Sequence, residues 1–384
     1  MKTRAIVIGG GLHGTSTGLH LAQKGLDVLV IEKNSVGRHA SGVNAGGVRQ
    51  LRRHPAEIAL SVAAMDRWLN LDAFLGEDLA PMCQFTGHVG QVAVAETEAE
   101  MAGLVAREAE LHELGWTHEE LLDQAALRRV APALATHCVG GLISRRDGHA
   151  NPYRTSQAFR LKAQRDGVRF QEGMRVLGLV QVGTGWHVET SAGTFNAELV
   201  VNCGGAWGWQ VAEMVGEALP HIEFAPTMMV SARVPKFLDP VVVGTGRKLS
   251  FKQTENGTVV IGGGILGIPD LDAETADPVA ERLVESARTV YDLFPTMRTA
   301  TIVRCWAGLE ARMPDEIPVI GPSTMAANLW HAFGYSGHGF QLAPIVGALL
   351  ADLIVDGKSP LPLEPFRAGR FNEGPVAAHP GATS

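Results

Sequence analysis

Runs of hydrophobic residues and the glycines that interrupt them predict the first elements of the chain. Residues 5–8 (AIVI) form an unbroken apolar run, which is typical of a parallel strand buried on both faces. A helix is expected from about His13 to Lys24, and Gly25 follows as a stop signal. The run LDVLVIE then predicts a second strand with Glu32 at its tip.

Later segments predict further sheet material. Residues 174–195 (MRVLGLVQVGTGWHVETSAGTF) alternate as an antiparallel ribbon, and residues 199–202 form another buried strand before Gly204. An amphipathic helix is expected within residues 96–116, and Thr117 with Glu120 predicts a capping box for a helix after it. Other segments that indicate strands are HVGQVAVAE, APTMMVSARV, KLSFKQ, GTVVIGGG and TIVRCWAGL.

Composition limits the class of protein. The 384 residues are 46% hydrophobic and carry a formal net charge of −7, which gives no general attraction to nucleic acid or to an anionic membrane. The four cysteines form no CxxC pair, so a zinc ribbon and a dithiol redox pair are excluded, and no metal site is expected. No signal peptide is visible, and Pro344 and Asp352 interrupt the most apolar late stretch. We therefore expect a cytoplasmic protein with no membrane span.

The segment GGGLHG after the first strand fits the dinucleotide fingerprint G-x-G-x-x-G. Gly9 permits a tight turn, Gly11 lets the backbone approach a pyrophosphate, and Gly14 lets the helix pack closely on the strand. Glu32 follows at the spacing expected of an acid that accepts hydrogen bonds from ribose hydroxyls, which argues against NADP. This stretch alone leaves NAD and FAD open.

Two further glycine-rich loops favour FAD. Residues 35–54 form a long irregular loop where a nicotinamide dehydrogenase would continue with an ordinary helix, and residues 334–339 precede a helix that begins near Phe340. A second helix N-terminus beside the cofactor suits a flavin, because its amides stabilise the negative charge of the reduced ring.

These motifs together resemble the FAD-dependent D-amino-acid oxidase/glycine oxidase superfamily, in its sarcosine-oxidase-like branch. The segments SGVNAGGVRQLRRH, DGHANP, LVVNCGGAW, WAGLEARMPDEIPVIG and GYSGHGFQLAP carry the resemblance over nearly the whole chain. Within that branch the chain is most similar to beta-type catalytic subunits of heteromeric dehydrogenases for opines, hydroxyproline, proline and sarcosine. The resemblance implies a small-molecule substrate and, in some members, other subunits as partners.

The expected fold is α/β, with a Rossmann-like FAD-binding domain and a second α+β substrate domain built on a mainly antiparallel sheet. Because cofactor-binding segments lie at both ends and in the middle of the chain, the domains must be discontinuous. The FAD-binding domain is assigned to residues 1–85, 145–215 and 325–384, and the substrate domain to residues 86–144 and 216–324.

The cofactor-binding residues are expected in the glycine loops and beside them. The position at which some simpler members attach FAD through a cysteine falls near Gly308, so FAD is expected to bind non-covalently. The full set is Gly9, Gly11, Leu12, His13, Gly14, Glu32, Lys33, Ser41, Gly42, Asn44, Ala45, Gly46, Gly47, Val176, Gly204, Gly308, Gly337, His338, Gly339, Phe340 and Gln341.

Five residues are candidates for the chemistry: Arg49, Arg52, Lys252, His338 and Gln341. By motif match, Arg49 takes the family's position beside the flavin and Arg52 the position for carboxylate binding, which suits the fork of a guanidinium. Lys252 is a candidate for promoting the reaction with oxygen. His338 is a candidate wall of the active site, and Gln341 replaces a lysine of simpler sarcosine oxidases. Arg53 is expected to be exposed.

The leading hypothesis is an FAD-dependent dehydrogenase or oxidase that removes a hydride from the carbon beside the amine of an amino acid or secondary amine. The product would be an imine that water hydrolyses. One alternative is a non-catalytic or electron-relay flavoprotein subunit of a heteromeric complex. A weaker alternative is an NAD-linked dehydrogenase.

Overall fold

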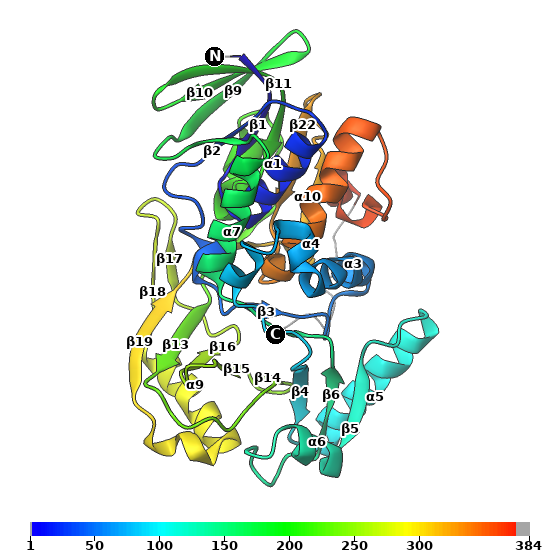
Figure 1. Ribbon diagram of the computed structural model, residues 1–384, viewed down its shortest axis with the longest axis vertical. Helices are drawn as coiled ribbons and strands as arrows, with labels where there is room; N and C mark the ends of the chain where they lie inside the picture. The colour runs from blue at the N-terminus through cyan, green and yellow to red at the C-terminus, as the bar shows by residue number, and fades with distance from the viewer. Residues whose placement is uncertain (1, 374–384) are drawn as a thin grey trace.

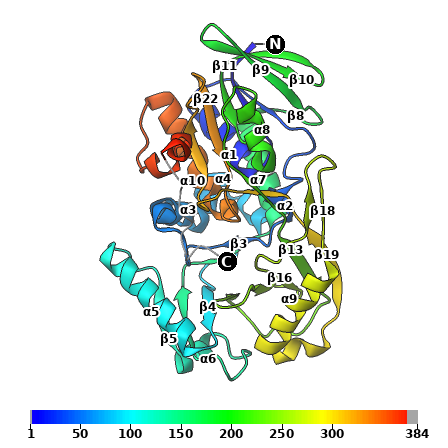
Figure 2. The same cartoon turned by 180° about the vertical axis from the view of Figure 1, so that it is seen from behind.

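Two eight-stranded sheets organise the computed structural model, which describes residues 2–373. Figure 1 shows them one above the other, with the helices labelled α1 and α10 beside the upper sheet and α9 and α5 beside the lower one. Figure 2 shows the same two layers from behind. The cofactor-binding segments predicted from the sequence lie mainly in the upper part.

The upper sheet is parallel through its centre, as the unbroken apolar runs predict. Ala5 of the central strand pairs with Val28 on one side and with Leu199 on the other. One edge strand is antiparallel, and a ribbon of two antiparallel strands extends from the long third strand. The order is β21 (Val319–Pro322), β22 (Leu329–Phe333), β11 (Gly193–Asn202), β1 (Lys2–Ile8), β2 (Val28–Ile31) and β8 (Arg169–Gln171), with β9 (Val176–Val182) and β10 (Gly185–Thr190) in the ribbon.

Helix α10 (Gly339–Asp356) packs against α1 (Leu12–Gln23) and α3 (Ile58–Leu69). The helix expected to begin near Phe340 is continuous, and Pro344 lies inside it. Trp68 Nε1 donates to the carbonyl of Gln341 at 2.8 Å, so a neighbouring side chain binds the helix backbone near the proline. By length and composition α10 could cross a membrane, yet most of it is buried inside the protein, as in a core helix.

The lower sheet is mainly antiparallel, as predicted; only β14 and β4 pair in parallel. Its core includes Phe251 stacked on Phe294 with ring centroids 4.1 Å apart. Its order is β19 (Ile302–Ala307), β13 (Thr227–Ser231), β16 (Val259–Gly262), β15 (Ser250–Gln253), β14 (Val241–Gly244), β4 (Gln91–Ala95), β6 (Gly140–Ser144) and β5 (Glu120–Asp123). Helices α5 (Glu98–Glu113), α6 (Gln124–Val130) and α9 (Ala280–Leu293) accompany it.

Three pairs of strands and several helices lie outside the elements named so far. The pairs are β3 (Gly47–Val48) with β7 (Gly148–His149), β12 (Ile222–Phe224) with β20 (Glu310–Arg312), and β17 (Ile268–Asp270) with β18 (Thr275–Asp277). The remaining helices are α2 (Ala40–Val43), α4 (Leu71–Leu75), α7 (Pro152–Arg165) and α8 (Gly208–Glu213). Single 3₁₀ turns are Pro55–Glu57, Ala80–Cys83, Gly205–Trp207, Pro295–Thr299, Glu364–Phe366 and Ala368–Asn372.

Two local expectations differ from the structure. The capping box at Thr117 and Glu120 is wrong, because Glu120 begins a strand and Asp123 caps the next helix by accepting from the amide of Ala126 at 2.6 Å. Strand β21 lies in the range predicted for the substrate domain but pairs with β22 in the upper sheet. The apolar run of β21 fits either sheet, so its pairing depends on tertiary contacts.

The contact between α1 and α10 predicts a position that tolerates only glycine. A Cβ at Gly347 would lie 2.4 Å from Ser16 Oγ and 2.5 Å from the Ser16 carbonyl carbon. Gly347→Ala should therefore lower the free energy of unfolding by about 1–3 kcal/mol through overpacking. Urea unfolding followed by circular dichroism measures this change.

The matched control is Gly103→Ala in α5, where an added Cβ would meet nothing within 4 Å. This variant should be more stable than the starting protein by about 0.5–1 kcal/mol, because alanine loses less backbone entropy in a helix. Equal effects of the two substitutions would contradict the proposed close packing of α1 on α10.

Candidate cofactor and active site

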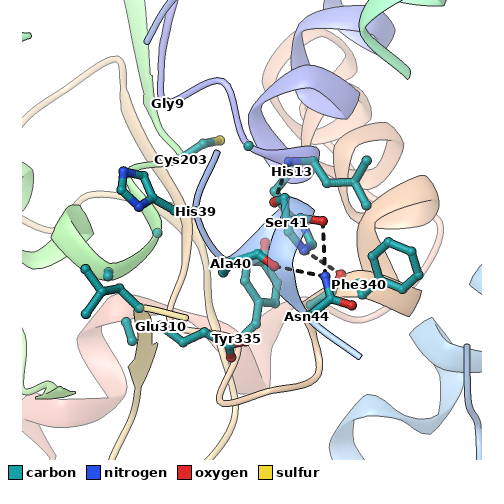
Figure 3. A pocket seen from close by; sticks show the side chains of 18 of the residues that line it. Gly9, His13, His39, Ala40, Ser41, Asn44, Cys203, Glu310, Tyr335 and Phe340 are labelled. Carbon is teal, nitrogen blue, oxygen red and sulfur yellow. Dashed lines mark hydrogen bonds between the residues drawn. The ribbon is translucent and has the colours of Figure 1, made fainter. Parts of the chain in front are cut away.

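The carboxyl ends of four neighbouring strands open on one cavity. Gly9 follows β1, Glu32 follows β2, Cys203 follows β11 and Gly334 follows β22, and all four residues line the cavity. In doubly wound α/β sheets, ligands bind at the carboxyl ends of the strands, where the strand order reverses. Figure 3 shows Gly9, Cys203, Tyr335 and Glu310 around this cavity.

The first loop requires glycine for two measurable reasons. Gly9 has a φ of +105°, and a Cβ there would lie 2.3 Å from the carbonyl oxygen of Cys203. A Cβ at Gly14 would lie 1.9 Å from the carbonyl oxygen of Gly9, so Gly14 lets α1 pack against the turn. The fingerprint roles predicted for these two glycines match the geometry.

Glu32 holds the same loop from the tip of β2. Its Oε2 accepts from the amide of Gly10 at 2.7 Å and its Oε1 from the amide of Asn34 at 2.8 Å. Burial raises the pKa of this carboxyl group, while the two amide bonds lower it. Because each carboxylate oxygen has a second lone pair, Glu32 retains the capacity to bind ribose hydroxyls.

The two glycine loops at opposite ends of the chain are in direct contact. His13 Nε2 lies 2.8 Å from the carbonyl oxygen of Gly339, and its ring stacks on Tyr335 with centroids 3.6 Å apart. Burial lowers the pKa of His13 to about 3, so the imidazole is neutral at pH 7. His13 therefore positions the backbone of the second loop.

The loop after α2 contributes the third glycine segment. Asn44 folds this loop by donating from Nδ2 to the carbonyl of Ala40 at 2.9 Å and accepting the amide of Gly46 at 2.7 Å. Gly46 has a φ of +74°, and a Cβ there would lie 2.9 Å from Lys252 Nζ. Lys252 lines a neighbouring cavity that the loop borders, and burial lowers its pKa to about 7.

The three arginines after this loop have different surroundings. Arg49 lines the cofactor cavity and donates from Nη1 to the carbonyl of Leu51 at 2.9 Å. Burial, then Arg53 and Arg52, lower the pKa of Arg49 to about 9, which leaves it charged at pH 7. Arg52 lies outside the cavity lining, with Nη1 3.4 Å from the carbonyl oxygen of Gly244.

Arg53 is buried, so the prediction of an exposed side chain is wrong. Its exposure is 2%, and its Nε donates to the carbonyl of Arg49 at 3.1 Å. Its Nη2 lies 3.3 Å from Gln341 Oε1. A run of three basic residues is usually solvated, and only the packing of α3 and α10 shows that Arg53 lies between them.

His338 and Gln341 point away from the cofactor cavity. His338 Nδ1 lies 3.0 Å from Glu57 Oε2, and burial lowers the pKa of His338 to about 4. Gln341 donates to the carbonyl of Ser61 at 2.8 Å and accepts from Ser61 Oγ at 3.1 Å. Both side chains therefore stabilise the contact between α3 and α10 in this structure, and neither lines the cavity.

A cluster of charged side chains lies beside Trp207 in the wall of the cavity. Lys33 Nζ lies 3.0 Å from the ring centroid of Trp207 and 3.2 Å from Glu274. Glu274, between β17 and β18, also pairs with Arg175. Sequence reasoning missed Trp207, Glu274 and Arg175, although Trp207 closes the quoted motif LVVNCGGAW and Arg175 precedes Val176, which lines the cavity.

The other predicted cofactor-binding residues divide into two groups. Most of them line the cavity. Those outside its lining are Gly14, Gly42, Gly308, His338 and Gln341. Gly42 and Gly308 permit close packing instead, since added Cβ atoms would lie 2.0 Å from the Gly37 carbonyl oxygen and 2.7 Å from Val43 Cγ2.

The cavity fits an extended dinucleotide rather than a metal ion. Many of the lining residues are small, so a ligand can come close to their backbone. The lining also includes His13, whose Nδ1 has no hydrogen-bond partner within residues 2–373. Over the same part of the chain, no group of three metal-ligating side chains occurs. Cys203 lines the cavity, but burial raises the pKa of its thiol to about 12, so it is a poor nucleophile.

Comparisons with known proteins agree with this geometry. Residues 4–353 match the DAO family, described as FAD dependent oxidoreductase. The hydrogen cyanide synthase subunit HcnC of Pseudomonas protegens is 31% identical over 67% of this chain, and the match spans 61% of that relative's length. Sarcosine oxidase subunit beta of Rhizobium meliloti is 27% identical over 96% of this chain and 88% of its own.

Solved structures share the whole fold. The crystal structure of L-proline dehydrogenase from P. horikoshii superposes with a TM-score of 0.88 at 26% identity, covering 98% of this chain and 99% of the other. The prediction of FAD rather than NAD is therefore confirmed at the level of the family. With its paired glycine loops around one cavity, the chain belongs to the DAO family of FAD-dependent oxidoreductases.

Proposed function

We propose that this enzyme oxidises the C–N bond of an amino acid or secondary amine, with transfer of a hydride to FAD and hydrolysis of the resulting imine by water. The observation that carries the proposal is Arg49, a buried cation that lines the same cavity as both glycine loops. A guanidinium is suited to a substrate carboxylate. The relatives named for sarcosine and L-proline support an amino-acid substrate.

The residues of the chain would bind and orient the two reactants. The loops at Gly9, Gly11 and Gly204 would hold the diphosphate, and the amides at the start of α10 would face the flavin ring. FAD, when bound, supplies the acceptor for two electrons. Arg49 would fix the carboxylate, and the apolar lining at Met228, Val243 and Leu309 would exclude water.

A second candidate function is an electron-transferring subunit of a heteromeric complex. Two relatives are named as subunits, HcnC and sarcosine oxidase subunit beta, which favours partner chains. Under this alternative the isolated chain binds FAD but no amine reduces it.

Anaerobic mixing with candidate amines tests the function directly. When the yellow holoenzyme is mixed with an opine, a proline, an N-methyl amino acid or a plain amino acid, at least one of them should bleach the flavin absorbance at about 450 nm. The absorbance is lost because the substrate transfers two electrons to the flavin. Failure of the whole panel to reduce the flavin would reject the proposed function and favour the electron-transferring alternative.

Arg49→Ala should weaken substrate binding about 10- to 100-fold, because a charged hydrogen bond worth about 1.5–3 kcal/mol is lost. The dependence of the flavin reduction rate on substrate concentration measures this change. Arg52→Ala is the matched control, since Arg52 does not line the cavity. A larger loss in Arg52→Ala would assign the carboxylate to Arg52 instead.

Lys252→Met should slow reoxidation of the reduced flavin by oxygen and leave reduction by substrate unchanged. Because burial lowers the pKa of Lys252 to about 7, its charge is present at pH 6 and mostly lost at pH 8. Reoxidation after photoreduction should therefore slow as pH rises through 7, and the variant should show no such step. Stopped-flow absorbance measures both rates; identical profiles would exclude a role for Lys252.

A further inference from the structure

Glu310 lies between the two glycine loops that enclose the cavity. It begins β20 and pairs with Phe224 of β12. Two residues before Glu310, Gly308 packs on Val43, the last residue of α2. Directly after Glu310, the carbonyl of Ala311 accepts a hydrogen bond from the amide of Ser336 at 3.2 Å. Figure 3 shows Glu310 and Tyr335 on the same side of the cavity.

The half-buried carboxylate of Glu310 has fewer polar partners than the fully buried acids of the protein. Within residues 2–373 no basic side chain forms an ion pair with it, and the backbone amide of Gly337 is the group that lowers its pKa. By contrast, Asp147 accepts from the amides of Gln50 and Leu51 and from Ser144 Oγ. The free side of the Glu310 carboxylate faces the cavity, which its side chain lines.

Among the described residues near Tyr335 that line the cavity, Glu310 is the one suited to accept a proton. Tyr335 is a phenol whose pKa burial raises well above 10, and burial lowers the pKa of His13 to about 3, so its free Nδ1 is a poor proton acceptor near neutral pH. Arg49 is cationic, and Lys252 lies behind Gly46 in the neighbouring cavity. Burial raises the pKa of Glu310 to about 7, which suits proton transfer near neutral pH.

An amine substrate supplies the proton that needs an acceptor. Amino acids bind mainly as ammonium ions, but the nitrogen must have a free electron pair to stabilise the carbon that loses a hydride. We propose that Glu310 binds the ammonium group of the substrate and accepts its proton before the C–H bond is broken. In this step an N–H bond breaks, an O–H bond forms on the carboxylate, and the electron pair remains on nitrogen. This inference rests on the proposed function.

The first test follows anaerobic flavin reduction as a function of pH. In the wild-type holoenzyme the limiting rate should rise through about pH 7, where Glu310 becomes ionised, and level off above pH 8. Glu310→Gln should be at least about 100-fold slower at pH 7, the usual contribution of a positioned base. Its rate should continue to rise with pH as neutral substrate becomes available. A flat wild-type profile, or an unchanged rate in the variant, would overturn the proposal.

The flavin potential separates this role from simple electrostatic tuning. Removing a negative charge near the ring stabilises reduced flavin, so a charge that only tunes the potential predicts faster reduction in Glu310→Gln. Slower reduction at an equal or higher potential supports proton acceptance, and faster reduction rejects it. Glu120→Gln, at a surface ion pair with Arg145, is the control and should reduce like the wild type.

A binding test distinguishes failure of this inference from failure of the proposed function. Trimethylglycine carries a fixed positive charge and cannot be oxidised through a nitrogen electron pair, and 3,3-dimethylbutanoate is a carboxylate of the same shape that lacks this positive charge. At pH 8.5 the wild type should bind trimethylglycine at least about tenfold more tightly by flavin difference absorbance, a preference of roughly 1.4 kcal/mol. Glu310→Gln should lose this preference. Absence of the preference in the wild type rejects the role of Glu310 even where an amine reduces the flavin.

Discussion

The close approach of backbone to backbone at the carboxyl ends of the parallel strands is the constraint on which the rest of the structure depends. Gly9 lies so near the carbonyl of Cys203 that no side chain fits, and Gly14 lies as near to Gly9. These contacts hold β1, β11 and α1 together at one edge of the sheet. The contact of His13 with Gly339 then brings α10 to the same edge, although the two residues are 326 positions apart.

Buried charges fix the third loop against that edge. Asp147 accepts the amides of Gln50 and Leu51, and Arg53 donates to the carbonyl of Arg49. The backbone on both sides of the Arg49 side chain is therefore held by groups that do not line the cavity. Burying a charge is costly, and the hydrogen bonds of Asp147 and Arg53 with this backbone offset part of that cost. These bonds leave the Arg49 side chain directed to the cavity.

The chemistry is placed where the two sheets meet. Strand β3 carries Gly47 from the nucleotide side and pairs with β7, which follows β6 of the lower sheet. In the lower sheet, β15 places Lys252 behind Gly46, and β20, which pairs with β12 outside that sheet, places Glu310 beside Gly337. Arg49 and Glu310 thus reach the cofactor cavity from different elements, and Lys252 lies in the neighbouring cavity. Burial lowers the pKa of both Arg49 and His13, which leaves Arg49 charged and His13 neutral at pH 7.

The sequence by itself determined the elements and the cofactor loops, because apolar runs, alternation and glycine spacing are local properties that survive without tertiary context. It predicted the parallel and antiparallel sheets and the position of Val176 and Gly204 at the cavity. Only the tertiary structure decided which polar side chains face the cavity. Arg53, His338 and Gln341 are buried between helices, whereas Glu310 faces the cavity, because burial and orientation depend on contacts between segments hundreds of residues apart.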